Sequence, residues 1–461
     1  MTATDNLFAR AMAPPDAETA FSDHAVIAAM LRFECALARG QERLGLIPAG
    51  IAGIIERHAQ TLVLDPATLV RETQTAGTLA IPLVHRLSAA VQSDSPDAAR
   101  HVHFGATSQD VIDTALSSCT RVAVAKLDTA VGNAIVAATT LARRHAADPI
   151  LARTLLQAAG ITTFGWKFAH AALALARCRD RVRATARVSI AVSLGGPTGS
   201  LSAFGRQGPA LRAAVAHDLG LADPGASWHS HRDQWLALAT DTALLVGIAA
   251  KIAGDIALMA QNDVGSVSRG AIDAGGGSSA MPHKHNPVSA MRVLAAAQPV
   301  PGIVASLLGG MRQAHERALG EWQSGLALWP LLFDRAIDAT TALATLLGEF
   351  HADTARACAN IDAQLGMLFS SALAARFSPA LGRHEAHALV ATMCATATRE
   401  HRQLLDVALA ARRDDQRLAA ISVDGIEAVF DIDAAAITSV LEVDEMLALI
   451  SNGVRPAPDN A

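Results

Sequence analysis

The stretch LALATDTALLVGIAAKIAGDIALM (residues 236–259) is apolar over a length that could cross a bilayer, and it decides the class of fold. It also contains Asp241, Lys251 and Asp255, each of which is costly at bilayer depth. We therefore predict a helix that is buried in a bundle or at a subunit contact, rather than a membrane span.

The sequence on either side of this run is also typical of helices. Apolar residues recur at three- and four-residue spacings, Ala and Leu are abundant, and alternating β-branched runs are nearly absent. Long helices connected by modest loops indicate an all-α helical bundle. The pattern predicts a helix that follows a cap at residues 21–23 and runs to about Gly40. It also predicts helices over residues 110–145, 165–189, 232–263 and 331–355, with another after Pro287 that Pro299 and Pro301 interrupt.

The composition excludes several classes of protein. Apolar residues make up 51% of the 461 residues and charged residues 18%, which excludes disorder and implies a large core or subunit interfaces. The net charge of −5 argues against a nucleic-acid partner. The chain has no tyrosine, so no tyrosine of its own can serve as an acid or base.

The cysteines and the N-terminal sequence favour a cytoplasmic protein. None of the five cysteines forms a C-x-x-C pair, so neither a zinc knuckle nor a disulfide framework is indicated. The sequence begins MTATDNLFARAMAPPDAE, without a basic start followed by an apolar run, so we do not expect a signal peptide.

The stretch GGGSSAMPHKHNP (residues 275–287) carries the clearest chemistry. Its three glycines permit unusual backbone angles and predict a mobile loop. Ser278 can donate or accept a proton, Lys284 supplies positive charge and Asn286 supplies a neutral donor. Such a set suits a carboxylate on which charge develops during a reaction. The alternative is a plain surface loop that ends in a helix-stopping proline.

Three further segments carry polar side chains that suit an anion. In HVHFGATSQDVIDT (residues 101–114), Thr107 and Ser108 precede a long helix, where hydroxyls and free N–H groups form an anion seat or an ordinary cap. In RTLLQ (residues 153–157), Thr154 and Gln157 would share a helix face if the segment is helical. In HER (residues 315–317), the Arg317 guanidinium suits a carboxylate, although each group alone is more often a surface or capping residue.

The sequence indicates no metal site or cofactor. Trp228–Asp233, WHSHRD, holds two histidines, but their spacing forms no metal-binding face. We also expect neither a nucleic-acid partner nor a membrane span.

Taken together, the motifs identify a family resemblance. GSSAMPHKHNP closely resembles the G-S-S-x-M-P-x-K-x-N-P loop of the fumarase/aspartase superfamily, HFGATSQDVIDT resembles its Thr-Ser helix-start motif, and LGGPTGS resembles its third short region. The three occur in the order typical of that superfamily. The resemblance extends through FSDHAVIAAMLRFECALAR, QAHERALGEW and LGRHEAHALV, so it covers essentially the whole chain.

The resemblance implies an architecture of three helical domains. We expect an N-terminal domain at residues 1–109, a central bundle at 110–357 with a mobile loop at 273–287, and a small C-terminal domain at 358–461. In that superfamily four subunits pack their bundles into a twenty-helix core, and each active site forms where three subunits meet. A homotetramer with shared sites is therefore expected.

The resemblance also implies a β-elimination, or its reverse, on a carbon next to a carboxylate of a small polycarboxylate substrate, without a metal or nucleotide cofactor. Ser278 occupies the position of the base and is expected, with Lys284, to be catalytic. The residues expected to bind substrate carboxylates are Thr107, Ser108, Thr154, Gln157, Asn286 and Arg317.

Within the superfamily, ATSQDVIDTA, MPHKHNPV, HERALGEW and LGRHEAH look most like the branch that lactonises 3-carboxy-cis,cis-muconate in the β-ketoadipate pathway. Leu155 stands where amine-releasing relatives carry a histidine, and Ala158 where some lactonising relatives do. The second acid or base is open among His103, His229 and His315. The alternatives are a C–N lyase that releases fumarate and a non-catalytic scaffold that keeps only the fold.

Overall fold

The computed structural model describes residues 7, 11, 19–267, 277–278 and 280–452 of the chain. Its residues form two compact units, and each is described by itself. The first unit comprises Met1–Val131, Cys178–Ala250 and Arg292–Ala342. The second comprises Gly132–Arg177, Lys251–Met291 and Leu343–Ala461.

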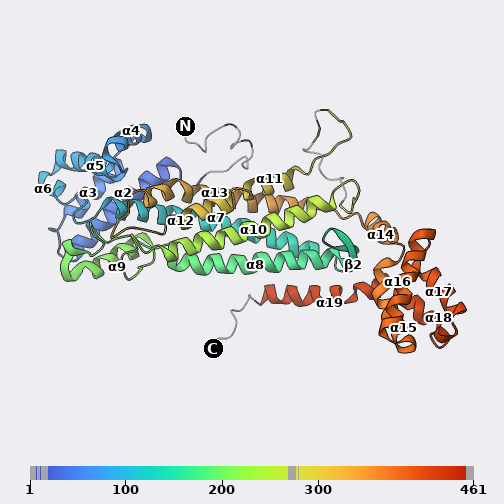
Figure 1. The fold of residues 1–461 in the computed structure, drawn as a ribbon. Helices are drawn as coiled ribbons and strands as arrows, with labels where there is room; N and C mark the ends of the chain where they lie inside the picture. The colour runs from blue at the N-terminus through green and yellow to red at the C-terminus, as the bar shows by residue number, and fades with distance from the viewer. Residues whose placement is uncertain (1–6, 8–10, 12–18, 268–276, 279, 453–461) are drawn as a thin grey trace. The chain divides into compact units, whose positions relative to one another are not determined.

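The described residues are predominantly helical, which confirms the all-α class (Figure 1). The only regular strands among them form one short hairpin. In chain order the elements are α2 (Asp23–Arg43), α3 (Ile51–Thr61), α4 (Pro66–Ala76), α5 (Ala80–Asp94), α6 (Pro96–Ala99), α7 (Ser108–Arg144), β1 (Pro149–Thr154), β2 (Gln157–Thr163), α8 (Phe164–Ser189), α9 (Gly208–Leu219), α10 (Asp233–Met259), α11 (Val288–Ala297), α12 (Val300–Gly309), α13 (Glu321–Gly348), α14 (Thr354–Asp362), α15 (Ser370–Leu381), α16 (Arg383–Glu400), α17 (Leu404–Asp414), α18 (Val423–Glu427) and α19 (Ile432–Ser451).

Most of the predicted helices are confirmed, with one clear difference at α13. As expected, the proline-rich segment at 299–301 separates α11 from α12. The expected start of α13 near residue 331 is wrong, because the helix begins at Glu321 and contains Pro330 in its interior. An interior proline costs one backbone hydrogen bond. Burial of Trp329 and Phe333 on either side offsets that cost.

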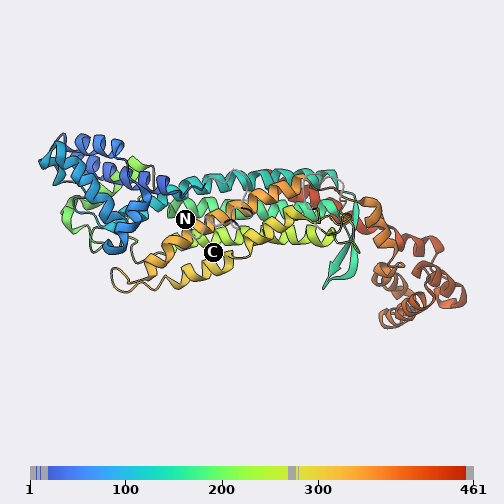
Figure 2. The same cartoon turned by 90° about the horizontal axis from the view of Figure 1, so that it is seen from above.

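A stack of tryptophans ties the helices of the first unit together. The rings of Trp228 and Trp235 lie 5.2 Å apart and those of Trp235 and Trp329 lie 3.9 Å apart. The indole Nε1 of Trp329 donates to the hydroxyl of Thr120, 2.8 Å away. These contacts join α7, α10 and α13, which run side by side in this unit (Figures 1 and 2). The stack fixes the helices on which the polar groups described below lie.

The second unit contains the β1–β2 hairpin. Thr154 and Gln157 would share a helix face only if residues 153–157 were helical, and they instead face each other as the last pair of an antiparallel ladder. Leu155 and Leu156 form the turn, with φ values of 50° and 65°. The strand after the turn carries Ile161, Thr162 and Thr163, whose β-branched side chains favour extended backbone.

The C-terminal helices have an apolar cluster of their own. Leu373, Phe377, Val390, Leu404 and Ile426 are among its buried members, and they come from α15 to α18. The division into three domains at residues 109 and 357 stays a prediction.

By length and composition, three helical stretches among the described residues are long and apolar enough to cross a membrane: Ser108–Arg144 (α7), Asp233–Met259 (α10) and Val288–Gly309, which comprises α11 and α12. The sequence singled out only the second. Several of its side chains are buried, including Leu238 and Leu245, whereas Leu244 and Leu258 are 50% and 45% exposed. These two leucines expose about half of their apolar surface among the residues that the structure describes.

Candidate active site

The start of α7 is held by a buried carboxylate. Thr107 donates its backbone N–H to Asp110 Oδ2 at 3.0 Å, as a helix cap does. The same carboxylate accepts the N–H groups of Gly195 and Gly196, at 2.8 and 2.9 Å, and a 2.7 Å contact from His229 Nε2. These donors offset the cost of burying the charge. The LGGPTGS segment is therefore attached to the Thr-Ser motif.

The two hydroxyls of this motif remain available to a ligand. Thr107 and Ser108 are both half-buried. Neither hydroxyl has a hydrogen-bond partner in the part of the chain that the structure describes. They stand at the positive end of a long helix, whose first N–H groups favour an anion. An anion seat at Thr107 and Ser108 stays a prediction.

A second buried carboxylate lies one turn further along α7. Asp113 accepts Arg232 Nη1 at 2.7 Å and Nη2 at 3.2 Å, and Trp322 Nε1 at 3.0 Å. It also accepts the side-chain amide of Gln109 at 3.1 Å. The Arg232 guanidinium packs over the ring of Trp228, 4.8 Å from its centroid. These hydrogen bonds fix the Asp113 carboxylate in place next to the first turn of the helix.

Arg317 is held against that same first turn. Its Nε donates to Gln109 Oε1 at 3.0 Å, although the two residues are 208 positions apart. The terminal guanidinium nitrogens have no hydrogen-bond partner within the described ranges. The structure thus brings the Arg317 side chain to the residue that follows Ser108, with its fork free to bind a carboxylate.

The three candidate histidines differ in their surroundings. His229 is buried and bound to Asp110, and His315 is exposed. His103 Nδ1 lies 2.7 Å from Oε1 of the buried Glu34. Burial of the imidazole alone would lower its pKa, but the charge of Glu34 and its hydrogen bond outweigh burial and raise the pKa of His103.

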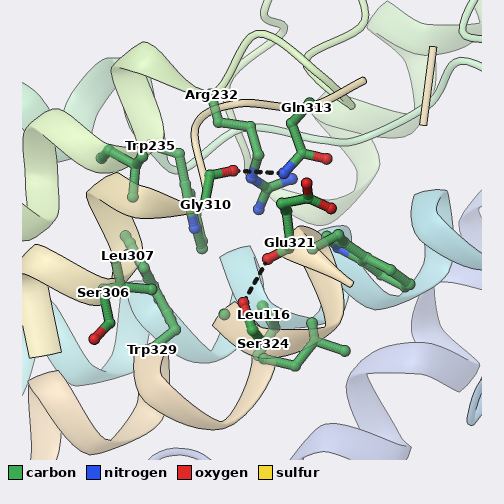
Figure 3. A pocket seen from close by; sticks show the side chains of 14 residues that line it. Leu116, Arg232, Trp235, Ser306, Leu307, Gly310, Gln313, Glu321, Ser324 and Trp329 are labelled. Atoms are coloured by element: carbon green, nitrogen blue, oxygen red, sulfur yellow. Dashed lines mark hydrogen bonds between the residues drawn. The ribbon is translucent and has the colours of Figure 1, made fainter. Parts of the chain in front are cut away.

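A cavity of about 30 Å³ lies behind Arg232 in the first unit (Figure 3). Its lining includes Gln313, Glu321 and Trp322, and Gln313 donates to the carbonyl of Gly310 at 2.7 Å. Substrate pockets usually span several hundred Å³. This cavity is too small for a polycarboxylate substrate.

The second unit carries the loop residues. Ser278 is half-buried, and its hydroxyl oxygen accepts the N–H groups of Ala280 and Met281 at 3.3 and 3.1 Å. Two such donors favour a developing negative charge on that oxygen. Lys284 is exposed and Asn286 is half-buried. The remainder of the predicted 273–287 loop, at 273–276 and 279, lies outside the described residues.

The predicted site residues divide between the two units. Thr107, Ser108 and Arg317 belong to the first, and Thr154, Gln157, Ser278, Lys284 and Asn286 belong to the second. Thr154 and Gln157 are exposed and pair with each other on the hairpin. Within the described ranges, neither shares a hydrogen bond with the loop residues.

The sequence did not identify Gln109, Asp110, Asp113 and Arg232 as parts of the site. The available signal was the run of closely spaced polar residues at 109, 110 and 113 within a helix predicted to lie in the bundle, because polar side chains that are buried in a bundle need partners. Among the residues with described positions, no group of three or more His, Cys, Asp or Glu is placed to hold a metal.

Comparison with known proteins shows the family. A family model described as lyase matches residues 13–302. A 3-carboxy-cis,cis-muconate cycloisomerase from Bradyrhizobium diazoefficiens is 37% identical over 97% of this chain and 98% of its own length. A nitrosuccinate lyase from Streptomyces davaonensis is 36% identical over 79% of each chain.

A crystal structure shows the same similarity in the fold. The 3-carboxy-cis,cis-muconate lactonizing enzyme from Pseudomonas putida superposes with a TM-score of 0.87 at 31% identity, over 97% of this chain and 100% of that one. The chain therefore belongs to the lyase family of the fumarase/aspartase superfamily and is an enzyme of that superfamily.

Proposed function

We propose that this enzyme is a homotetrameric cycloisomerase that converts 3-carboxy-cis,cis-muconate to 4-carboxymuconolactone in aromatic degradation. The observation that carries the proposal is the similarity over 97% of the chain to a cycloisomerase of that name. The side chains support it, because they offer a hydroxyl for proton transfer and several separate donors for carboxylates. The substrate has three carboxylates.

The reaction needs one new C–O bond and one proton. A carboxylate oxygen of the substrate attacks a carbon of the conjugated double-bond system, and the electron pair moves onto the carboxylate next to the neighbouring carbon. That carbon then takes a proton, which completes the lactone. The nucleophile is part of the substrate, so the enzyme mainly holds the chain in a reactive conformation.

Ser278 is the proposed proton donor to the carbon. The N–H groups of Ala280 and Met281 at its oxygen stabilise the charge that remains when the proton leaves. Lys284, close to Ser278 in the same segment, supplies positive charge to the substrate carboxylates.

The other donors hold the carboxylates. Thr107 and Ser108 bind the carboxylate at the reacting carbon, where the additional charge appears. A preorganised donor of this kind is worth about 2.7–4 kcal/mol of barrier. The remaining substrate-binding residues are Arg317, Asn286, Thr154 and Gln157.

The assembly is proposed from exposed apolar side chains on the long helices. Val122 and Val136 on α7 are 47% and 66% exposed, and Leu244 and Leu258 on α10 are similarly open. Apolar surface of this kind marks a protein interface. Four subunits that bury these faces form a tetramer core, in which residues of both units contribute to sites shared between copies. We place the enzyme in the cytoplasm.

The test of this function is a spectrophotometric assay. 3-Carboxy-cis,cis-muconate should lose its diene absorbance when the enzyme is added. Ser278→Ala should abolish turnover while the assembly and its unfolding midpoint stay unchanged, because among the described residues the half-buried hydroxyl is hydrogen-bonded to Ala280 and Met281 of its own loop. Ser371→Ala, an exposed serine on α15, is the matched control and should keep full activity. An unchanged spectrum with well-folded wild-type enzyme contradicts the proposal.

A second candidate function is a C–N lyase that releases fumarate. The observation that favours it is the similarity to a nitrosuccinate lyase over 79% of the chain. Leu155 argues against the amine-releasing members, since leucine cannot protonate a departing amine. Fumarate formation from nitrosuccinate or a succinyl adduct, without any reaction of 3-carboxymuconate, would establish this alternative.

A further inference from the structure

Gln109 is buried, and both the nitrogen and the oxygen of its side-chain amide form hydrogen bonds. Its Nε2 donates to Asp113 Oδ2 at 3.1 Å and to the carbonyl of His229 at 3.0 Å. Its Oε1 accepts from Arg317 Nε at 3.0 Å. Only one orientation of the amide gives this set, because Asp113 and the carbonyl need a donor and Arg317 needs an acceptor.

The orientation of the Gln109 amide is fixed by its partner Asp113. Asp113 is held by Arg232 and by Trp322, and both partners are themselves packed against other groups of the first unit. The Arg232 guanidinium packs over the ring of Trp228, and Arg232 and Trp322 are both among the residues that line the cavity of Figure 3. The amide oxygen of Gln109 is therefore a fixed acceptor at the start of α7.

The amide oxygen of Gln109 accepts a hydrogen bond from Arg317, a side chain with few other contacts among the described residues. Arg317 lies in the connection between α12 and α13, and its side chain is exposed. An arginine on such a connection loses considerable rotamer freedom when it binds a ligand. One bond to Nε restricts the guanidinium plane and leaves the two Nη groups, which form the fork that grips a carboxylate.

We propose that Gln109 is a positioning residue that orients the Arg317 guanidinium beside Ser108 for a substrate carboxylate. This inference rests on the proposed function and deepens it. The relay runs from Arg317 through Gln109 and Asp113 to Arg232. Gln109 itself does not touch the substrate.

The test is a double-mutant cycle on turnover of 3-carboxy-cis,cis-muconate. Gln109→Leu keeps the volume but removes the acceptor, and we expect kcat/KM to fall about 10- to 100-fold, the value of a hydrogen bond to a charged group. Arg317→Ala should cost at least as much. If Gln109 acts through Arg317, the double variant should be no worse than Arg317→Ala alone. Losses that multiply would overturn the proposal.

Chemical rescue separates positioning from simple support of the helix. Millimolar guanidinium should restore part of the activity of Arg317→Ala, because Gln109 Oε1 provides its docking point. It should not restore the double variant. Equal rescue of both would overturn the proposal. Gln207→Leu is the control. It removes another hydrogen bond of a side-chain amide in the first unit, from Gln207 Nε2 to the Leu44 carbonyl, and should leave kcat/KM unchanged.

A second variant and the activity of the wild-type enzyme distinguish a failure of the positioning role from a failure of the proposed function. If Gln109→Leu does not fold, Gln109→Met replaces it, with a similar length and no acceptor. If wild-type enzyme does not convert 3-carboxymuconate, the proposed function is wrong. If wild-type enzyme converts it and Gln109→Leu retains full kcat/KM, the function stands and the positioning role is wrong.

Discussion

At the scale of single residues, the pair formed by His103 and Glu34 gives the clearest electrostatic consequence. The buried carboxylate raises the pKa of His103 above its ordinary value near 6.5 despite the burial of the ring. A raised pKa in the folded state means that the protonated imidazole stabilises the fold. That contribution is complete below the unfolded-state pKa and is lost as pH rises through the folded-state pKa.

We therefore expect Glu34→Gln to cost most at low pH. The difference in free energy of unfolding between wild type and this variant should be largest below about pH 6.5. It should shrink as the pH rises past the folded-state pKa of His103. Urea unfolding between pH 5.5 and 8.5 measures it, and His103→Gln should remove the pH dependence. A difference that stays constant over this range would contradict the assignment.

Some of these residues could be predicted from sequence, and others could not. Ser278, Lys284 and Asn286 stand in one short motif, so the chemistry of their side chains can be read along the chain. The bond between Gln109 and Arg317 joins residues 208 positions apart. No local pattern reports which distant partner a buried amide will find.

At the scale of elements, the first turn of α7 depends on Asp110. Its buried carboxylate binds the LGGPTGS segment, the Thr107 amide and His229 at once. Asp128, further along the same helix, binds Arg179 and Arg183 at the surface, which keeps its pKa well below the usual range. The two aspartates are similarly well paired but differ in burial.

This difference gives a matched pair of variants. Asp110→Ala should lower the free energy of unfolding by about 3–5 kcal/mol, because it leaves buried donors without a partner. Asp128→Ala should cost only about 1 kcal/mol, because water screens its ion pairs. Urea unfolding of both variants compares them. An equal loss in free energy of unfolding for the two variants would show that burial does not determine how much an aspartate's hydrogen bonds stabilise the fold.

The turn of the β1–β2 hairpin predicts a pair of substitutions that should stabilise the chain rather than destabilise it. Leu155 and Leu156 both have positive φ, a conformation that side chains other than Gly and Asn rarely adopt, and they are 96% and 75% exposed. Two-residue turns with two positive φ values favour Asn-Gly. Leu155→Asn combined with Leu156→Gly should therefore stabilise the chain by about 1–3 kcal/mol.

Thermal unfolding measures this effect, and the reversed pair Leu155→Gly with Leu156→Val is the control. Valine strongly resists positive φ, so the control should be less stable than the Asn-Gly variant. A lower midpoint for Asn-Gly than for wild type would show that the leucines make a stabilising contact.

The hairpin also shows where a sequence pattern misleads at this scale. Residues 151–159 read LARTLLQAA, a composition typical of helices. The antiparallel pairing with Ile161 and Thr162 overrides that preference. The long helices were predictable because their apolar spacing persists over many turns, whereas a short segment carries too few residues for its own propensity to prevail.

At the scale of the whole molecule, the exposed face of α10 should decide the assembly. Leu244→Glu places a charge on the proposed subunit contact, where its desolvation is costly. We expect the tetramer to dissociate and activity to fall with it, because the proposed sites are shared between copies. Sedimentation velocity measures the assembly. Val63→Glu, at a 93% exposed valine outside the helices, should keep the tetramer. A Leu244→Glu enzyme that stays tetrameric would place the contact elsewhere.

The tryptophan stack gives this enzyme an intrinsic optical reporter. The chain contains no tyrosine, and four of its five tryptophans, Trp228, Trp235, Trp322 and Trp329, belong to the first unit. Trp322 donates to Asp113, which is bonded to Gln109 and through it to Arg317. We therefore expect a ligand in the proposed anion seat at the start of α7 to change the ultraviolet emission of these indoles, so that its binding is observed without any added dye.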